Sequence, residues 1–240
     1  MSNAEAALNI GRSPYTDPFL TSTLLSIQLL LYPQLRIELT SQYSYDLVRE
    51  LLAGALDLAI VNQPPESPKL TTTTVAESPF YIAMSKQDHL AGWPSVKLDA
   101  MAGRSWILFE RRLHPPLYDE VMRVAETRKI ASARIQHITA PEEAFQHVAD
   151  GSAIVFLLKP GALLMARNGI TIRPLAEEAL SLKTCLAARA DNKSKVVSEL
   201  VRAFVRKLSN MTESNQLTSF SCTSATACSL LLKLGAYGLI

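Results

Sequence analysis

The side chains that could perform catalysis are present in this sequence, but not at the spacing that catalysis requires. Gly11-Arg12-Ser13 begins like the G-x-S-x-G turn of a catalytic serine, but Tyr15 stands where the second glycine is needed. No G-x-G-x-x-G or G-x-x-x-x-G-K-S/T sequence occurs to bind a dinucleotide or a triphosphate. The four histidines lack H-x-x-x-H or H-E-x-x-H spacing for zinc. We therefore expect no enzyme activity, no metal and no cofactor, with a hydrolase that uses Ser13 as the weak alternative.

Hydroxyl groups instead stand beside predicted helix N-termini, where free backbone N–H groups and the helix dipole favour an anion. Ser13 to Thr16 precede one predicted helix, Tyr43-Ser44 precede the next, and Thr139 to Glu142 form a capping box at a third. The first two groups follow strands of one predicted sheet, so they would meet at its carboxyl edge. Capping alone is the alternative role for each residue, whereas the cluster as a whole favours an anion site.

Arginine and aromatic residues at strand ends could complete such a site. Arg111 follows the predicted strand that ends at Phe109, and its guanidinium could bind a carboxylate through two parallel hydrogen bonds. An ion pair with Glu110 or Asp119 is the alternative. Four aromatic rings lie at strand ends or turns and could pack on a ligand, namely Tyr15, Tyr43, Phe109 and Phe156. Core packing is the alternative for Phe156.

The stretch from Leu47 to Val61 contains the kinds of element that would position these residues. Leu47, Leu51 and Leu52 recur at helical spacing, and Gly54 suits the left-handed conformation that ends a helix. The apolar run over residues 56–61 is typical of a parallel strand that helices cover on both faces. A helix that leads into a buried strand indicates the α/β class.

Strands and helices alternate in two separate runs along the chain. The first run has strands at 7–12, 35–39 and 56–61, with helices that begin near residues 18 and 44. A strand pattern at 74–85 leads to a second run, with strands at 106–109, 135–138 and 153–158 and helices at 115–129 and 141–149. Strands at 170–175 and 182–189 and an amphipathic helix at 194–208 follow. This order predicts two α/β subdomains joined by two chain crossings.

The composition limits the classes of partner and compartment. The 240 residues carry a net charge of +2 and are 48% hydrophobic, which allows two domains but gives little reason to expect tight binding to nucleic acid phosphates. Three cysteines, Cys185, Cys222 and Cys228, form no C-x-x-C pair and are expected as free thiols in a reducing cytoplasm. The first residues lack the pattern of a secretory signal, and the most apolar stretch, 19–32, is too short and too interrupted to cross a membrane.

Several short motifs in a fixed order resemble the effector-binding domain of LysR-type transcriptional regulators. The resemblance covers roughly Leu8 to Leu208. It rests on Leu8 to Pro14, Leu31-Tyr-Pro33-x-Leu35, Leu51 to Ile60 (LLAGALDLAI), Glu77 to Phe80 before His89 to Ala91, Gly151 to Pro160, and Ile170 to Leu175. The resemblance implies two type 2 periplasmic-binding-protein-like subdomains, joined by two crossover strands, with a small effector in the cleft between them. We place the first subdomain at 5–84 plus 187–209 and the second at 85–186.

The resemblance also implies which residues contact the effector. In this family the contacts come from the turn after the first strand, here Ser13 and Pro14, from the N-terminus of the second helix, here Tyr43 and Ser44, and from the strand end at Phe109 with Arg111. Tyr43 replaces the threonine that usually opens this helix. The candidate ligand-binding residues are therefore Ser13, Pro14, Tyr15, Tyr43, Ser44, Asn62, Phe109, Arg111, Thr139 and Phe156, with Asn62 included because it follows the strand that would open into the cleft.

The resemblance implies a homodimer, and a tetramer in a full-length regulator, with the first helix of one subunit packed on the last helix of its partner. The expected interface residues are Leu20, Leu24, Ile27, Leu31 and Val201. DNA binding would belong to a winged helix-turn-helix domain that precedes this sequence. The expected function is sensing of a small organic acid, and a transporter's solute-binding protein is the alternative. Residues 210–240 are rich in Ser and Thr, and a native extension, an oligomerisation strand and a cloning artefact all stay open.

Overall fold

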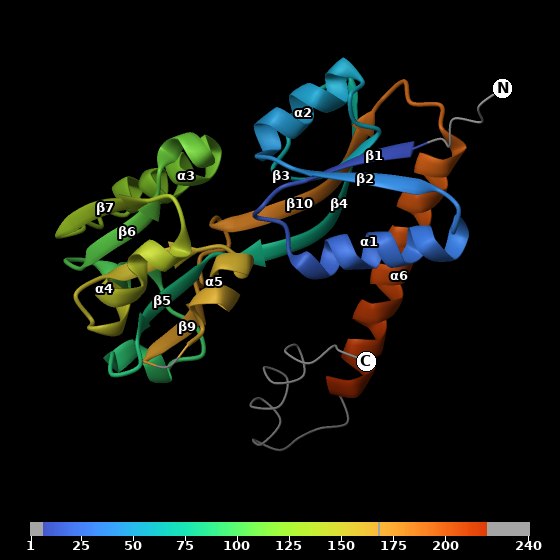
Figure 1. The fold of residues 1–240 in the computed structure, drawn as a ribbon. Helices are drawn as coiled ribbons and strands as arrows, with labels where there is room; N and C mark the ends of the chain where they lie inside the picture. Colours follow the sequence, from blue (N-terminus) through green and yellow to red (C-terminus); the bar gives the residue numbers. More distant parts are fainter. Residues whose placement is uncertain (1–6, 168, 220–240) are drawn as a thin grey trace.

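The computed structural model describes residues 7–167 and 169–219, which form two α/β subdomains, each built on a five-stranded sheet (Figure 1). The first sheet has the order β2-β1-β3-β10-β4 and contains β1 (Ala7–Arg12), β2 (Arg36–Ser41), β3 (Leu58–Asn62), β4 (Leu70–Pro79) and β10 (Ser181–Arg189). The second has the order β7-β6-β8-β5-β9 and contains β5 (Tyr81–Ser85), β6 (Ser105–Phe109), β7 (Arg134–Ile138), β8 (Ile154–Leu157) and β9 (Ile170–Pro174). The predicted pair of α/β subdomains with two crossings is confirmed.

Helices cover both faces of the first sheet, as the apolar run of β3 predicts. Alternate strand residues point to opposite faces. Leu58 and Ile60 belong to the core beneath α1 (Pro18–Leu31) and α6 (Lys195–Ser219), whereas Ala59 and Val61 belong to the core beneath α2 (Ser44–Ala53). All five residues of β3 are buried. The strand is therefore held from both sides, which fixes the position of its carboxyl end.

Two glycines allow α2 to pack closely on this sheet. Gly54 adopts φ +77° and ends α2, as the sequence predicts. A Cβ atom at Gly11 in β1 would lie 2.5 Å from Cδ2 of Leu47 in α2, so no larger residue fits without displacing that side chain. The expected inward position of Leu52 is wrong, because Leu52 is 40% exposed and Val48 faces the core in its place.

The second subdomain repeats this arrangement with shorter helices. Its helices are α3 (Pro115–Thr127), α4 (Phe145–Ala149) and α5 (Lys159–Met165), and its short 3-10 helices are η1 (His89–Gly92), η2 (Leu98–Met101), η3 (Arg111–Leu113) and η4 (Pro141–Ala144). α3 covers one face of the sheet, and α4 with α5 covers the other. The sequence patterns did not predict α5, and the single helix expected over 141–149 is divided into η4 and α4.

The two crossings between the subdomains lie side by side. Phe80 N–H, between β4 and β5, donates to Leu180 O before β10 at 3.2 Å, and Pro79 pairs with Ser181. Residues 81–84, which we assigned to the first subdomain, pair in the second sheet, and residues 181–186 pair in the first. Both boundaries therefore shift to Phe80 and Leu180, because a strand belongs to the sheet that satisfies its backbone hydrogen bonds.

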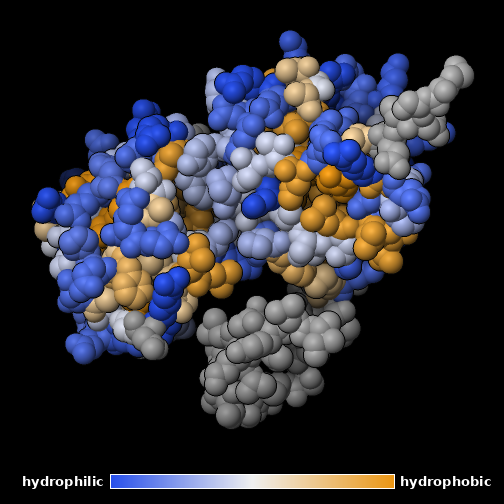
Figure 2. Space-filling model, in the orientation of Figure 1, coloured by the Kyte–Doolittle hydropathy of each residue, from blue (hydrophilic) through white to orange (hydrophobic). Residues whose placement is uncertain are grey.

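The apolar residues of α1 divide into a buried and an exposed face. Leu20, Leu24 and Ile27, which we expected at a dimer interface, are buried in the subunit's own core against the sheet and α6. Leu31 remains 46% exposed, and Val201 packs at the edge of that core. The exposed apolar face of α1 consists of Phe19, Leu29, Leu30 and Leu31, and hydrophobic side chains gather over α1 in Figure 2.

Within the described residues, α6 continues past its expected end at Leu208 to Ser219. Part of the segment that the sequence left unassigned is therefore helical. Residues 220–240, including Cys222 and Cys228, lie outside the part of the chain that the structure describes. Cys185 in β10 is a buried free thiol, as expected. None of the described helices combines the length and hydropathy needed to span a bilayer.

Candidate functional site

A cavity of about 560 Å³ lies between the subdomains, and both contribute to its walls. The first subdomain supplies the start of α2 and the segment after β3, and the second supplies η3 and the start of α3. The lining residues are Tyr43, Ser44, Tyr45, Asp46, Asn62, Gln63, Pro64, Pro65, Arg112, Leu113, His114 and Pro115. We call this space the interdomain cavity. Three of the predicted ligand-binding residues, Tyr43, Ser44 and Asn62, line it.

Ser44 fastens the first turn of α2 to the end of β3. Its Oγ accepts a hydrogen bond from Asn62 N–H at 2.9 Å, and both residues are buried. Tyr43 occupies the N-cap position of α2 but makes no side-chain capping bond. The first backbone bond of the helix runs from Leu47 N–H to Tyr43 O at 3.0 Å, so the earlier N–H groups have no intrahelical partner. The helix thus presents an uncapped N-terminus beside the cavity.

The side chain of Asn62 reaches from the end of β3 toward the neighbouring strand β10. Its Nδ2 donates to Thr184 Oγ1 at 3.0 Å, but its Oδ1 is buried without a hydrogen-bond partner. The next residue, Gln63, has φ +44°, a conformation that non-glycine residues rarely adopt, and its Oε1 is also buried without a partner. Both acceptor oxygens are therefore buried without a donor among the described residues.

His114 brings a hydrogen-bond donor from the second subdomain. Its Nδ1 accepts from Leu117 N–H at 3.3 Å and caps α3, so in the neutral ring the proton is on Nε2. Burial lowers the pKa of His114, and hydrogen bonding to the backbones of His114 and Asn62 partly offsets that effect. Its Nε2 is buried. At neutral pH the ring is therefore uncharged.

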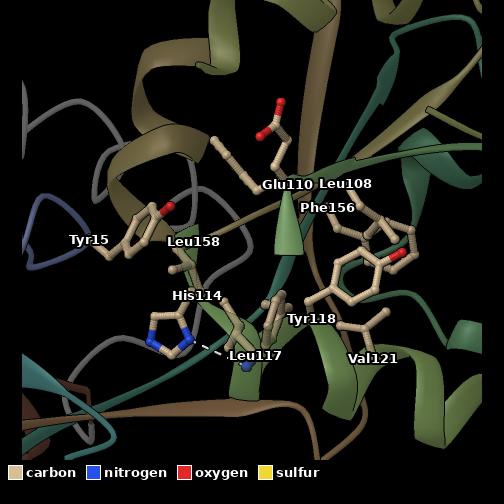
Figure 3. A pocket seen from close by; sticks show the side chains of 11 residues that line it. Tyr15, Leu108, Glu110, His114, Leu117, Tyr118, Val121, Phe156 and Leu158 are labelled. Atoms are coloured by element: carbon tan, nitrogen blue, oxygen red, sulfur yellow. Dashed lines mark hydrogen bonds between the residues drawn. The ribbon is translucent and has the colours of Figure 1, made fainter. Parts of the chain in front are cut away.

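An aromatic cluster around Tyr15 fills the space between the two subdomains. The Tyr15 ring centroid lies 6.0 Å from those of Tyr43 and Phe109 and 5.8 Å from that of His114. Burial raises the pKa of the Tyr15 phenol, and nearby Tyr43 adds to this effect, so the phenol stays neutral. Tyr15 and His114 also close a small apolar cavity of about 30 Å³ that Phe109 and Phe156 line (Figure 3). This smaller cavity has room for roughly one water molecule.

The turn after β1 is held in place by hydrogen bonds of Ser13. Ser13 is fully buried, its N–H donates to Ile60 O at 2.9 Å, and its Oγ accepts from Tyr15 N–H at 3.2 Å. Pro14 is exposed, and neither residue lines the cavities described above. The structure therefore gives Ser13 a part in orienting Tyr15, and no described histidine or carboxylate is hydrogen-bonded to its Oγ.

Arg111 and Thr139 are not among the residues that line the interdomain cavity. Arg111 is exposed and makes two hydrogen bonds to Asp119, Nε to Oδ1 at 2.6 Å and Nη2 to Oδ2 at 2.8 Å, which is the alternative that the sequence left open. Thr139 Oγ1 donates to Glu143 Oε1 at 2.6 Å at the start of η4. Phe156 is buried against Trp106 with a centroid distance of 5.1 Å and lines only the small cavity.

Sequence reasoning missed His114 and Gln63, which line the interdomain cavity, and Lys159, which joins the two subdomains. Lys159 Nζ, at the start of α5, lies 2.6 Å from Oδ2 of Asp17, the N-cap of α1, and so joins the two subdomains by an ion pair. His114 directly precedes Pro115 and Pro116, which open α3, and this position could have identified it as the N-cap. No sequence feature indicated that Gln63 would adopt a positive φ. Among the described residues no three His, Cys, Asp or Glu side chains are grouped to hold a metal.

Comparison with known proteins gives one family and one fold. The family model of the LysR substrate binding domain matches residues 2–209. A comparison with curated proteins found no match. The effector-binding domain of BenM with its effector benzoate is 17% identical, with a TM-score of 0.76 over 87% of this chain and 94% of its own. The CcmR regulatory domain of Synechocystis with 2-PG is 19% identical, with a TM-score of 0.70 over 86% of this chain and 99% of its own.

One similar structure is of a full-length protein in complex with DNA. Full-length CbnR in complex with its target DNA is 18% identical and has a TM-score of 0.67 over 86% of this chain and 71% of its own. These likenesses confirm the expected fold of two type 2 periplasmic-binding-protein-like subdomains. On the family model, which spans most of the sequence, the chain belongs to the LysR substrate-binding domain family.

Proposed function

We propose that this chain is the ligand-sensing part of a transcriptional regulator and that a small organic acid binds in its interdomain cavity. The observation that carries the proposal is that the cavity wall comes from both subdomains, with Asn62 on one side and His114 on the other. A ligand that contacts both walls binds one relative arrangement of the subdomains more tightly than another, and it therefore shifts their populations. Among the relatives, benzoate is the effector of BenM, and CcmR was solved with 2-PG.

The acid group is assigned to the N-terminus of α2 and to His114. The uncapped first turn offers N–H groups and the positive end of the helix dipole, which favour a carboxylate. His114 Nε2–H would add a donor from the opposite subdomain. Arg111, the cation we expected here, is engaged by Asp119, so the acid would be held by backbone and imidazole groups. Tyr43, with its ring 6.0 Å from that of Tyr15, supplies an aromatic wall.

The signal would pass to DNA through subunit pairing. We propose that the exposed face of α1, with Leu30 78% exposed, packs on α6 of a second copy, and that dimers associate as tetramers in the full-length regulator. A groove of about 350 Å³ between α1 and α6, lined by Leu30, Leu31 and Met211 among others, is suited to apolar side chains of a partner. A DNA-binding domain attached to this chain, rather than the chain itself, would contact an operator in the cytoplasm. Neither catalysis nor a cofactor has a part in this scheme, and the family match disfavours a transporter's solute-binding protein.

Titration calorimetry of the purified chain against a panel of aromatic and aliphatic carboxylates tests the site. The variant His114→Asn keeps a capping acceptor for Leu117 N–H but removes Nε2, so we expect a fold of unchanged stability and about tenfold weaker acid binding. His89→Asn is the matched control, since the His89 side chain is 80% exposed and far from the cavity lining. Unchanged affinity in His114→Asn, or no binding by any acid, would refute the proposal.

A further inference from the structure

We infer that the turn after β1, residues 13–17, holds the two subdomains together in the absence of any ligand, with Tyr15 as its main contact. We call these residues the interdomain turn. Two contacts carry the inference, namely the Tyr15 ring on the core of the second subdomain and the ion pair between Asp17 and Lys159. The inference goes beyond the proposed function, because it does not depend on which molecule binds in the interdomain cavity.

The first contact is the packing of Tyr15 on the wrong side of the subdomain boundary. Tyr15 follows β1 of the first sheet, but its partly buried ring packs on the hydrophobic core of the second subdomain. Of the described residues that line the small cavity of about 30 Å³, all except Tyr15 lie between Phe80 and Leu158. Figure 3 shows the Tyr15 ring beside Leu158 and His114. A side chain of the first subdomain therefore closes an apolar pocket of the second.

The pocket that this ring closes lies at the carboxyl edge of the second sheet. Leu108 and Phe109 end β6, Phe156 stands near the end of the parallel strand β8, and all three line the pocket. Open α/β sheets bind their ligands outside this edge. Tyr15 thus fills, with its own ring, a position at which a bound molecule could otherwise join the two subdomains.

The second contact attaches the same turn to another part of the second subdomain. Lys159 Nζ, in α5, lies 2.6 Å from Asp17 Oδ2, and the Asp17 side chain is only 17% exposed. The other carboxylate oxygen of Asp17 accepts from Phe19 N–H at 3.0 Å, which fixes the carboxylate on α1. Tyr15 contacts the segment around His114, before α3, whereas Asp17 contacts α5. Two separate points of attachment resist rotation of one subdomain on the other.

The interdomain turn is fixed to its own subdomain, so it moves with the first sheet. Ile60 O in β3 accepts from Ser13 N–H at 2.9 Å and from Thr16 Oγ1 at 3.5 Å. Thr16 N–H donates to Ser13 O at 3.0 Å, and Thr16 is 1% exposed. Relative motion is the usual behaviour of two domains that share a small interface. Because the turn cannot leave β3 easily, bending at the crossings near Phe80 and Leu180 has to break both contacts.

Distances between spin labels on the two subdomains test this inference on the whole chain without any added ligand. Suitable sites are Ala53→Cys at the end of α2 and Glu126→Cys near the end of α3, since both residues are exposed. Cys222→Ser and Cys228→Ser remove the other reactive thiols, and Cys185 is buried. Labelled chains are diluted with unlabelled ones, so that distances within one subunit dominate.

Tyr15→Ala should lengthen this distance by more than about 2 Å and broaden its distribution, because the ring no longer holds the second subdomain. Tyr15→Phe keeps the ring and should give the distances of the parent chain. Tyr45→Ala is the matched control, since Tyr45 belongs to the same subdomain and is 80% exposed. The same distribution in Tyr15→Ala and in the parent would overturn the inference.

Phenol should restore the closed arrangement, because it is the part of the tyrosine side chain that alanine lacks. Without the ring, the cavity of about 30 Å³ joins the space that the ring occupied, and enclosed apolar cavities of ~150 Å³ can bind a single ring. Calorimetry should show phenol binding at least about tenfold more tightly to Tyr15→Ala than to the parent or to Tyr45→Ala. Equal affinity for the three chains, or distances that stay long in saturating phenol, would contradict the role of the ring.

Lys159→Gln tests the second contact by itself and keeps the inference testable if Tyr15→Ala does not fold. The Lys159 side chain is 45% exposed, so its replacement should leave the fold intact and lengthen the distance by a smaller amount. Lys193→Gln, at an exposed lysine before α6, is the matched control and should change nothing. Parent-like distances in Lys159→Gln would show that the turn does not hold the second subdomain through α5, and the inference would be wrong.

Failure of this inference and failure of the proposed function give different results. If the distances change as expected but no carboxylate binds, the interdomain turn holds the subdomains together and the proposed function is wrong. If acids bind and depend on His114 but Tyr15→Ala keeps the distances of the parent, the proposed function stands and this inference is wrong.

Discussion

Replacing Ser44 by alanine should destabilise the chain by about 1–3 kcal/mol, because the change leaves Asn62 N–H buried without an acceptor. The hydrogen bond from Asn62 N–H to Ser44 Oγ is 2.9 Å long, and the two residues are 1% and 9% exposed, so water has little access to replace it. The alanine itself is neutral or favourable for α2, since Tyr43 rather than Ser44 occupies the N-cap position. The whole expected loss therefore comes from the unpaired N–H group.

Urea unfolding followed by circular dichroism measures this loss, and a thermal scan gives a second reading. For a chain of this size, each kcal/mol lowers Tm by roughly 2–4 °C, so the expected decrease is about 2–12 °C. Ser22→Ala is the matched control, because Ser22 is exposed on α1 and its Oγ donates to Phe19 O at 3.0 Å. That control should change the free energy of unfolding by less than about 0.5 kcal/mol.

The same variant should weaken acid binding, because the first turn of α2 is no longer fastened to the end of β3. Equal stability of Ser44→Ala and Ser22→Ala would refute the reasoning. It would mean that Asn62 N–H finds another acceptor and that Ser44 does not hold the cavity wall in place. The backbone of β3 and the N-terminus of α2 would then be positioned independently.

Four further outcomes are expected. Gly54→Ala should lower the free energy of unfolding by about 1–2 kcal/mol, measured in urea, since φ at this position is +77°. Arg111→Ala should leave acid binding unchanged in calorimetry, because that guanidinium is bound to Asp119. Stability should fall as the pH decreases below about 6.5, because burial lowers the pKa of His114 and the unfolded chain binds the proton first; His114→Asn should reduce this slope. Leu30→Glu should shift a dimer to monomer in light scattering without a lower Tm.

Specific results would contradict the three predictions for Gly54, Arg111 and Leu30. A Gly54→Ala variant as stable as the parent would show that the end of α2 can adopt another conformation. Weaker acid binding in Arg111→Ala would bring that side chain back into the site. For the dimer, Leu52→Glu on α2, at a leucine that is 40% exposed and outside α1 and α6, is the control, and an unchanged mass in Leu30→Glu would place the interface elsewhere.

Local patterns predicted most of the fold, since they depend on residues close together in the chain. The strand at 7–12, the helix that ends at Gly54 and the buried strand after it all appear where hydrophobic period and glycine position indicate. The helix α5 was missed because its seven residues, with Pro160 and Gly161 among them, carry no clear periodic signal. Helices this short are held by the sheet beneath them rather than by their own propensity.

The site was predicted only in part, because the side chains that a residue contacts come from segments far apart in the sequence. Arg111 could have faced the cleft or Asp119, and only the folded position of α3 decides between them. Leu24 and Ile27 were predicted to lie at a dimer interface because the sequence does not show that α6 packs on α1. Burial of His114 likewise arises from the meeting of two subdomains. The residues at the end of β3 and the start of α2 were found because strand ends and helix starts can be read locally.

The paired crossings at Phe80 and Leu180 have a mechanical consequence for signalling. Two antiparallel segments joined by a backbone hydrogen bond form a narrow ribbon, which bends easily across its face but resists shear and twist along its length. We therefore expect relative motion of the subdomains to occur mainly by bending of this ribbon. Under the proposed function, ligands of different outline would then produce the same kind of motion and differ in its amplitude, which predicts a graded response to a group of related acids.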